Sequence, residues 1–271
     1  MVNNVVFCIQ TLPHDNSGFS LPFPDSAELL EVIAEHNWLH PEDPIATMLT
    51  SSCKNTFQDG EQLIPVGSIE FVESGLRRWY GIERGLTPLF IPEPLRPFAH
   101  RWVQVTHGKQ QAESALADLG KAFIKSASVV KCDYAGIYHA GQKLPDDTDY
   151  FVSQTIDIVS EWRIFVHRGN ILDLKNYSGD PWQMPDRTTV EKMVEAFTNT
   201  PKTYTLDVAV LRNGQTAVIE VHNFIACGVS VCIINFFEKV NIRYRKGIWL
   251  PRLYILLRYV FKILVAISPI I

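Results

Sequence analysis

Two stretches in the second half of the chain alternate between apolar and polar residues, which is the pattern of β-strands with one buried face. Each stretch contains a glycine turn signal, so the pattern predicts two β-hairpins, at Glu161–Tyr177 and Tyr204–Asn223. A helix is expected between them, at Thr188–Phe197. The elements expected upstream are a strand at Arg101–Thr106, a helix at Gln110–Gly120, a short strand at Ala122–Lys125 and a further strand that precedes Gln154. Hairpins interleaved with helices indicate an α+β fold rather than a doubly wound parallel sheet.

In the first third of the chain, strands and a helix are expected to alternate, without the hairpins of the second half. A strand is expected at Val5–Ile9, a helix at Ser26–Glu35, and a second strand at Ile64–Val72, ending at Gly75. Residues 1–95 are therefore expected to form a small α/β lobe.

Prolines mark the expected boundary of this lobe. The segment Thr87–Pro97 contains prolines at 88, 92, 94 and 97, which a regular helix or a central strand does not accept. We therefore expect one domain at 1–95, a second at 96–240, and an atypical basic and apolar C-terminal segment at 241–271.

Composition narrows the class of protein. The 271 residues are 46% hydrophobic and 20% charged, which is ordinary for a globular protein. A net charge of -4 argues against broad nucleic-acid binding, which needs a basic surface. Five scattered cysteines without a CxxC pair, and no signal peptide, lead us to expect a reduced, cytoplasmic protein.

The segment 243–271 combines Arg and Lys with large apolar residues. Arg258 and Lys262 interrupt it before it reaches the roughly 20 apolar residues that a membrane span needs. A helix here would suit a membrane surface, or it would be a terminal helix packed on its own domain.

The second hairpin brings two carboxylates together. Asn213-Gly214 predicts a two-residue turn with positive φ at both positions, and this register places Asp207 opposite Glu220. Like charges that face each other are unfavourable unless something neutralises them. Oxygen ligands of this kind suit Mg²⁺ with a nucleotide; the alternative is that both are solvated surface acids.

The first hairpin brings two cations together. A three-residue loop at Arg168-Gly169-Asn170 aligns the apolar faces of the two strands and places Arg163 opposite Lys175. A polyphosphate would relieve their repulsion through charge-assisted hydrogen bonds. Alternatively, both are surface cations whose aliphatic stems pack on the sheet.

Two lysines precede the hairpins. Lys125 ends the apolar strand at Ala122–Lys125, and Lys131 follows the small residues Ser126-Ala-Ser128. This arrangement is not a P-loop, because no GxxxxGK[ST] motif is present. Lys125 is the better candidate for phosphate binding, whereas Lys131 also fits an ordinary surface position.

In this order, the motifs resemble the ATP-grasp superfamily, particularly a bacterial and phage clade named for two arginines and a lysine. The similar segments, spread over residues 60–228, are Gly67-Ser-Ile-Glu70, Phe123-Ile-Lys125, Glu161-Trp-Arg-Ile-Phe165, Asn176-Tyr-Ser-Gly-Asp180, Leu206-Asp207-Val208 and Glu220-Val-His-Asn223. The resemblance implies an ATP-grasp fold, in which antiparallel sheets with helices hold a nucleotide between two lobes, at 96–240. Residues 1–95 would be the lobe that precedes it.

The resemblance also implies roles for individual residues. Lys125 would contact the α-phosphate and Lys131 would lie near the adenine. The linker strand of Gln154, Thr155 and Ile156 would offer backbone groups to the adenine. Arg163 and Lys175 would bind the terminal phosphates, and Asp207, Glu220 and Asn223 would bind Mg²⁺. In the family the closing motif is Glu-x-Asn, but here His222 holds that position, so either His222 replaces the asparagine or a bulge turns Asn223 inward.

The function implied is that of an ATP-dependent carboxylate–amine ligase with an acylphosphate intermediate, acting on an amino acid or peptide. Its partners would be a small-molecule or peptide carboxylate and an amine. Two alternatives stay open. Asp207 and Glu220 with a following basic residue also resemble the metal site of a Mg²⁺-dependent nuclease. The altered C-terminus would also fit a catalytically inactive nucleotide-binding adaptor.

Overall fold

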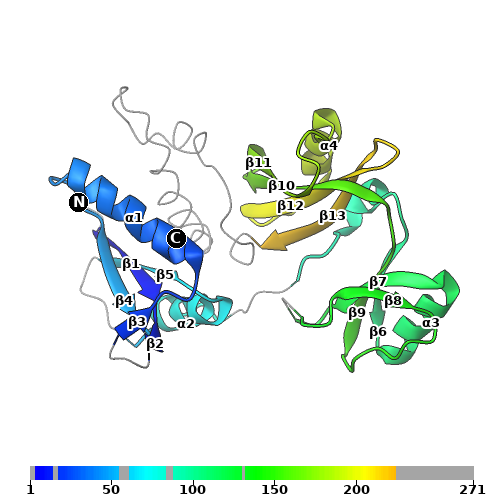
Figure 1. Cartoon of the computed structure of the whole chain (residues 1–271), viewed down its shortest axis with the longest axis horizontal. Helices are drawn as coiled ribbons and strands as arrows, with labels where there is room; N and C mark the ends of the chain where they lie inside the picture. The colour runs from blue at the N-terminus through cyan, green and yellow to red at the C-terminus, as the bar shows by residue number, and fades with distance from the viewer. Residues whose placement is uncertain (1–3, 15–17, 55–60, 84–87, 130–131, 224–271) are drawn as a thin grey trace. The chain divides into compact units, whose positions relative to one another are not determined.

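A computed structural model describes residues 4–14, 18–54, 61–83, 88–129 and 132–223. They form two compact units, one from residues 4–83 and one from residues 88–223 (Figure 1). Residues 88–95, which we expected in the first lobe, lie in the second unit because Ile91 and Leu95 are buried in its core.

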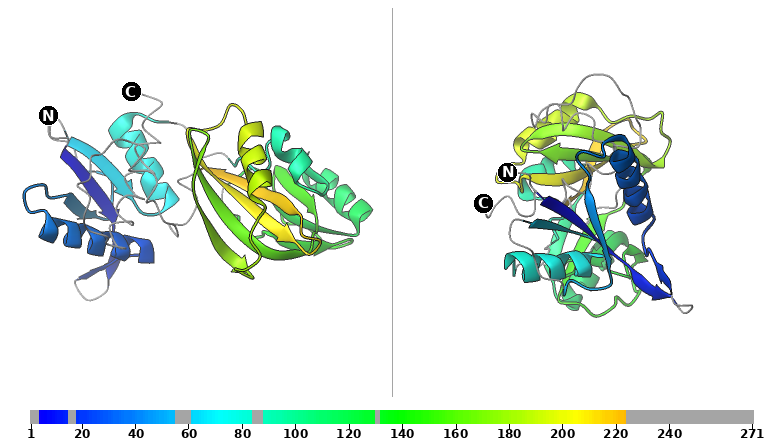
Figure 2. Two further views of the ribbon diagram at one scale, coloured as in Figure 1. Left: turned by 90° about the horizontal axis from the view of Figure 1, so that it is seen from above. Right: turned by 90° about the vertical axis from the view of Figure 1, so that its left-hand side faces the viewer.

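The first unit has the α/β character that the sequence predicts. Its three-stranded parallel sheet has the order β4-β1-β5, and α1 and α2 lie on opposite faces of that sheet (Figures 1 and 2). A short antiparallel hairpin of β2 and β3 follows β1. The elements are β1 (Asn4–Gln10), β2 (Leu12–His14), β3 (Gly18–Ser20), α1 (Pro24–Leu39), β4 (Ala46–Thr50), β5 (Glu61–Val66) and α2 (Ile69–Tyr80).

The prediction of a strand at Ile64–Val72 is wrong for its second half, which begins a helix. β5 ends at Val66, and α2 begins two residues after Gly67. The Ser68 side chain caps the helix by accepting a hydrogen bond from the amide of Phe71, at 3.1 Å. Gly75 lies inside the helix, where a Cβ would be 2.9 Å from the side chain of Pro65, so close packing against β5 explains this glycine.

The second unit is α+β, with two four-stranded antiparallel sheets. One sheet has the order β6-β9-β7-β8 and the other β11-β10-β12-β13. The elements are the 3₁₀ helix η1 (Glu93–Phe98), β6 (Val103–His107), α3 (Lys109–Leu119), β7 (Lys121–Ser126), β8 (Gly136–His139), β9 (Asp149–Gln154), β10 (Ile158–His167), β11 (Asn170–Gly179), α4 (Arg187–Ala196), β12 (Thr203–Leu211) and β13 (Thr216–Asn223). Apart from β8 and η1, each element corresponds to one expected from the sequence.

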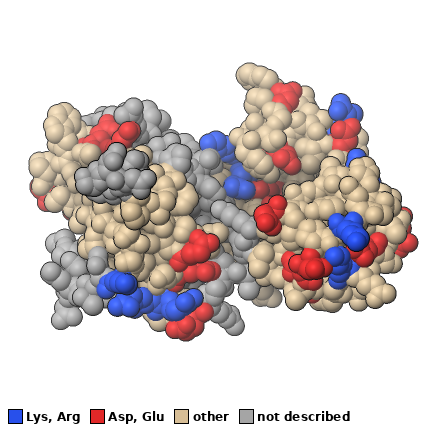
Figure 3. Space-filling model, turned by 60° about the horizontal axis from the view of Figure 1, so that its bottom comes forward, with Lys and Arg blue, Asp and Glu red and all other residues tan. Residues whose placement is uncertain are grey.

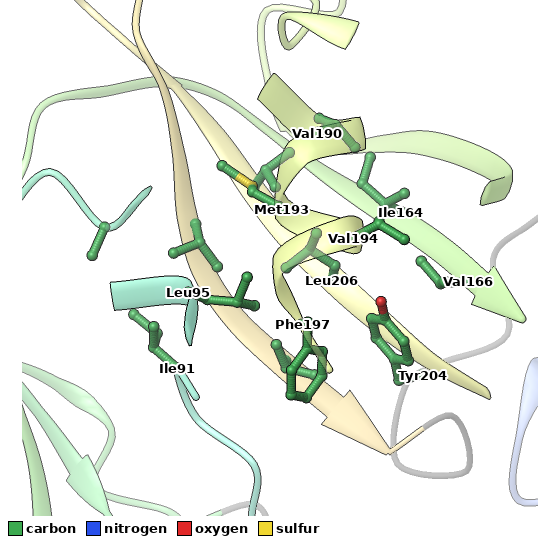
Figure 4. Packing of buried hydrophobic residues seen from close by; sticks show 14 of the residues in the cluster. Ile91, Leu95, Ile164, Val166, Val190, Met193, Val194, Phe197, Tyr204 and Leu206 are labelled. Atoms are coloured by element: carbon green, nitrogen blue, oxygen red, sulfur yellow. The ribbon is translucent and has the colours of Figure 1, made fainter. Parts of the chain in front are cut away.

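The main core lies between α4 and one face of the β10–β13 sheet (Figure 4). Val190, Met193 and Val194 of α4 pack against Ile164 and Leu206. Because side chains alternate along a strand, burial of this face directs the residues between these positions to the opposite face. That opposite face carries the charged residues.

Candidate functional site

One row of charged residues crosses the β10–β13 sheet. Arg163 faces Lys175 on β11 and Asp207 on β12, and Asp207 faces Glu220 on β13. The two expected pairings are therefore present, and the structure joins them into a single row of two cations followed by two carboxylates. On the visible face of this unit as a whole, acidic and basic side chains are interspersed (Figure 3).

Both turns differ from those expected. In the first hairpin the turn is the two-residue Arg168-Gly169, with φ values of 47° and 73°. In the second, only Gly214 has a positive φ, and the Leu211 amide donates to the Gln215 carbonyl around a three-residue turn.

A β-bulge in each hairpin restores the expected pairing. One lies between Phe165 and Val166, and the other between Asp207 and Val208. Each bulge shifts the register by one residue, which compensates for the unexpected turn length. The charged pairs therefore face each other although both turn assignments were wrong.

Three basic side chains surround the two carboxylates. Arg163 donates two hydrogen bonds to Asp207, from Nε to Oδ1 at 2.8 Å and from Nη2 to Oδ2 at 2.7 Å. Lys125, from the other sheet, forms an ion pair with Glu220. His222 Nε2 lies 2.7 Å from Glu220 Oε1 and 3.5 Å from Asp207 Oδ2. In this structure, therefore, side chains neutralise the carboxylate pair.

This charge pattern shifts the pKa values of two of these groups. Burial alone would raise the pKa of Glu220, but His222 and Lys125 together lower it to about 2. Burial alone would lower the pKa of His222, but the carboxylates of Asp207 and Glu220 raise it to about 9. At neutral pH, Glu220 is therefore ionised and His222 carries a proton between the two carboxylates.

The register of β13 separates His222 from Asn223. The bulge lies before Glu220, so the strand alternates regularly from Glu220 to Asn223. His222 points to the same face as Glu220, whereas Asn223 is paired with Tyr204, which belongs to the opposite, core face.

A cavity of about 330 Å³ adjoins this cluster. Lys125 and Glu220 lie in its wall, as do the predicted linker residues Gln154, Thr155 and Ile156. Apolar side chains line much of the remainder; they are Phe123, Ile137, Phe151, Ile158 and Ile219. The cavity therefore combines an apolar lining with a cation and a carboxylate.

Two aromatic rings support Lys125. Its Nζ lies 5.5 Å from the centroids of both Phe90 and Phe151, and these two rings stack on each other at 5.3 Å. A cation near aromatic faces is stabilised by their quadrupoles. This environment holds the ammonium group at the cavity wall.

The linker between β9 and β10 has backbone groups that bond to no other backbone group among the described residues. Gln154 donates from its amide to the carbonyl of Trp102 at 2.9 Å. Apart from the strand ladders, no backbone hydrogen bond engages Thr155 or Ile156 within the residues that the structure describes. Their peptide groups are therefore available to a ligand in the cavity.

Arg101 is a cavity residue that sequence reasoning missed. Its guanidinium donates to the carbonyls of Ala99 and Val218, at 3.0 and 2.8 Å, and to Ser153 Oγ at 2.8 Å. Burial lowers the pKa of Arg101 to about 10, against the opposing effect of Glu220. No motif distinguishes this arginine, because the contact with Val218 depends on how the two sheets pack.

Glu161 and Tyr177 were also missed, although both line the cavity. Burial, and then the charges of Asp207 and Glu220, raise the pKa of Glu161. The Arg163 guanidinium lies 5.4 Å from the centroid of the Tyr177 ring. Alternation along β10 could have identified Glu161, because it lies two residues from Arg163 on the same face.

Other predicted residues lie apart from the cavity. Lys175 is exposed on β11 and is absent from the cavity wall. Lys131 and the segment 241–271, including the part proposed for membrane contact, lie outside the described residues. Within the described part of the chain, no helix combines the length and apolar character needed to cross a membrane.

The residues present fit a divalent cation. One ligand atom each from Asp207, Glu220 and His222 lies within 4.8 Å of the other two. Two carboxylates are typical ligands of Mg²⁺, and the imidazole adds a nitrogen. A metal at this position would have to replace the proton of His222.

A comparison with known protein families identifies a family for this chain. The model of an ATP-grasp domain family, the second family of the clade named for two arginines and a lysine, matches residues 98–238, more than half of the 271 residues. A comparison with curated proteins finds no match. Among solved structures, N5-carboxyaminoimidazole synthetase from Staphylococcus aureus is 12% identical with a TM-score of 0.48, over 81% of this chain and 70% of that one.

Two further solved structures are similar at the same level. The ATP-grasp ligase PsnB, complexed with minimal precursor, Mg and ADP, is 8% identical with a TM-score of 0.47, over 96% of this chain and 97% of that one. The D-cycloserine synthetase DcsG is 12% identical with a TM-score of 0.46, over 80% of this chain and 90% of that one.

Proposed function

Because the chain belongs to this second ATP-grasp domain family of the clade named for two arginines and a lysine, we propose that it is an ATP-dependent ligase that joins a carboxylate to an amine. The observation that carries this proposal is the single cavity that Lys125, the Gln154–Ile156 linker and Glu220 line together. We further propose an amino acid or a peptide as the carboxylate substrate, on the basis of the family resemblance.

The apolar part of the cavity supports binding of the adenine. Phe123, Phe151 and Ile219 offer flat or branched apolar surfaces. The peptide groups of Thr155 and Ile156 have capacity to hydrogen-bond the edge of a base. An apolar pocket with a few polar groups that fix orientation is typical of a small-molecule site.

The basic side chains Lys125 and Arg163 support binding of the phosphates. Lys125 and Arg163 are held by carboxylates in this structure, and they would exchange these partners for phosphate oxygens when a nucleotide binds. Asp207 and Glu220 would then hold the metal, with His222 beside them. A bound divalent cation supplies charge neutralisation at the phosphates.

The proposed chemistry needs no nucleophile from the protein. An oxygen of the substrate carboxylate attacks the γ-phosphorus, the bond from that phosphorus to the bridging oxygen breaks, and ADP leaves. The amine nitrogen then attacks the acyl carbon, the carbon–oxygen bond to phosphate breaks, and the amine loses a proton to give an amide. Such phosphoryl transfer depends on positioning and charge neutralisation, which the cations around Asp207 and Glu220 can provide.

A thermal unfolding experiment with and without Mg-ATP tests the proposal. A ligand that binds only the folded state stabilises it by about 2.7 kcal/mol at a hundredfold excess over Kd. We expect Mg-ATP to raise the Tm of the wild type and of Glu195→Gln, an exposed control on α4, but much less that of Glu220→Gln. No rise in the wild type would contradict nucleotide binding.

Turnover assays separate the alternatives. Release of ADP that depends on a carboxylate and an amine would support the ligase. Cutting of DNA or RNA with Mg²⁺, lost in Glu220→Gln, would instead select the nuclease. Binding of ATP without either activity would select the adaptor.

A further inference from the structure

An imidazole nitrogen lies beside the carboxylate oxygens of the candidate metal site. His222 Nε2 lies 2.7 Å from Glu220 Oε1 and 3.5 Å from Asp207 Oδ2. No other nitrogen ligand accompanies the two carboxylates in the metal-ligating cluster found among the described residues. The question is which cation such a mixed set of ligands selects.

We propose that Asp207, Glu220 and His222 form a three-ligand site that prefers a divalent first-row transition metal such as Mn²⁺ over Mg²⁺. The inference rests on the proposed function, because the metal would be bound together with the nucleotide. It differs from that function in naming His222 as a direct ligand and in predicting the metal preference.

The distances are compatible with direct ligation. Metal–ligand distances in such sites are about 2.0–2.2 Å, so two adjacent ligands at a right angle are about 3 Å apart. The separations of 2.7 and 3.5 Å between His222 Nε2 and the carboxylate oxygens lie on either side of this value. Small side-chain rotations would bring the three atoms around one ion.

The backbone keeps His222 at this position. Regular pairing holds β13 beside β12, with Thr205 opposite His222 and Leu206 opposite Val221. Leu206 and Val221 are both buried in the core, so the strand cannot rotate to withdraw the imidazole without exposing them. The side chain of His222 is itself only 25% exposed.

The chemistry of the ligands sets the preference. Mg²⁺ favours carboxylate, carbonyl and water oxygens, whereas imidazole suits iron, nickel, copper and zinc. Affinity of a given site rises from Mn²⁺ towards Cu²⁺ along the first row. A nitrogen among the three protein ligands therefore favours divalent first-row transition metals relative to Mg²⁺, and Mn²⁺, the weakest binder of that series, gives the strictest test of the preference.

Two histidine variants provide a matched pair. In His222→Gln, the side-chain amide can place an oxygen near the position of Nε2, which keeps three ligands but removes the nitrogen. His139→Gln makes the same change at an exposed position on β8, outside the cavity wall. Only the first should alter metal preference.

Electron paramagnetic resonance of Mn²⁺ bound with ADP gives a readout that does not need activity. Competition with Mg²⁺ should show a preference for Mn²⁺ that falls by about tenfold in His222→Gln and is unchanged in His139→Gln. Pulsed spectra of the wild type should show nitrogen-14 modulation. Labelling histidine with nitrogen-15 should remove the imidazole part, which distinguishes it from adenine.

The outcomes separate this inference from the proposed function. If Mn²⁺ and ADP bind but histidine labelling leaves the modulation unchanged, direct ligation by His222 is wrong and nucleotide binding stands. The same holds if His222→Gln keeps the wild-type metal preference. If neither metal binds with ADP, both the inference and the proposed function fail. The labelling experiment uses only the wild type, so it decides even if His222→Gln does not fold.

Discussion

The guanidinium of Arg163 holds both carboxylate oxygens of Asp207, at 2.8 and 2.7 Å, on adjacent central strands of the sheet. The side chain of Asp207 is 2% exposed, so this ion pair is largely shielded from water. Removal of one member of such a pair leaves a buried charge, which is costlier than removal of both.

We therefore expect Arg163→Gln to lower the free energy of unfolding by about 3 kcal/mol. This value is the lower end of the range for breaking a buried ion pair, because the Arg163 side chain is 21% exposed. The double variant with Asp207→Asn should recover part of this loss. Urea unfolding of the ligand-free protein measures both effects. Arg187→Gln, which breaks an exposed pair with Glu191, should cost less than about 1 kcal/mol. Equal losses in the two single arginine variants would contradict the prediction.

Matching the apolar faces of two strands predicted the pairing of Arg163 with Lys175, whereas the pairing of Asp207 with Glu220 was predicted from the Asn213-Gly214 turn. Arg163 and Lys175 face each other, as do Asp207 and Glu220. Burial of one face fixes which residues can meet on the other. Both turn assignments were nevertheless wrong, because Asn213 lacks the positive φ that we assigned to it and Arg168 has one, and the bulges compensate for the difference. Bulges are local irregularities that the apolar pattern does not reveal.

The sequence did not predict the contacts between the two sheets of the second unit. Lys125 contacts Glu220, which lies 95 residues further along the chain, and Arg101 contacts Val218, which lies 117 residues further along. Such contacts depend on how two sheets pack together, whereas periodicity reports only on one element at a time. For the same reason we expected a metal to neutralise the carboxylates and did not foresee Lys125 beside Glu220. Arg163 lies on the same sheet as Asp207, but their contact depends on the pairing of β10 with β12, which joins two different hairpins.

The ion pairs predict that metal and nucleotide bind together. With Arg163, Lys125 and His222 around two carboxylates, the ligand-free site has little attraction for an added cation. We expect millimolar Mg²⁺ alone to change the Tm little, and Mg-ATP to raise it clearly. Differential scanning fluorimetry measures both.

Lys125→Met should change how strongly the Tm responds to Mg²⁺ alone and to Mg-ATP. Removing the cation beside Glu220 should increase the response to Mg²⁺ alone and weaken the response to Mg-ATP, because a phosphate contact is lost. Lys121→Met is the control, because Lys121 is an exposed lysine on the same strand. A large response of the wild type to Mg²⁺ alone would show that the side chains do not compensate the carboxylates.

Arg101 should affect nucleotide binding through the bulge of β13. It donates to the carbonyl of Val218, next to the bulge that precedes Glu220, and to Ser153 Oγ. Arg101 donates these hydrogen bonds from two nitrogens, Nε and Nη1, held in a rigid fork, whereas the donors of a lysine ammonium share one nitrogen and cannot match this geometry. We expect Arg101→Lys to lower the free energy of unfolding by about 1–3 kcal/mol and to weaken Mg-ATP binding. Arg96→Lys, at an exposed position on η1, should do neither.

Two glycines should differ in their tolerance of a methyl group. Gly179 and Gly214 have φ values of 74° and 82°, so alanine is strained at both by about 1–2 kcal/mol. At Gly214 a Cβ would meet no atom within 4 Å, whereas at Gly179 it would lie 2.1 Å from the carbonyl oxygen of Val159. Because that neighbour is backbone, β11 would have to move away from β10.

We therefore expect Gly214→Ala to cost about 1 kcal/mol and Gly179→Ala clearly more, because about 1–3 kcal/mol of overpacking is added to the strain. Urea unfolding of the two variants gives the comparison. Displacement of the end of β11 would also move Tyr177, whose ring lies beside Arg163, so Gly179→Ala should weaken Mg-ATP binding while Gly214→Ala leaves it unchanged. Equal stability losses would mean that β11 can separate from β10 at this end without cost, and Tyr177 would then be a poor candidate for a fixed part of the site.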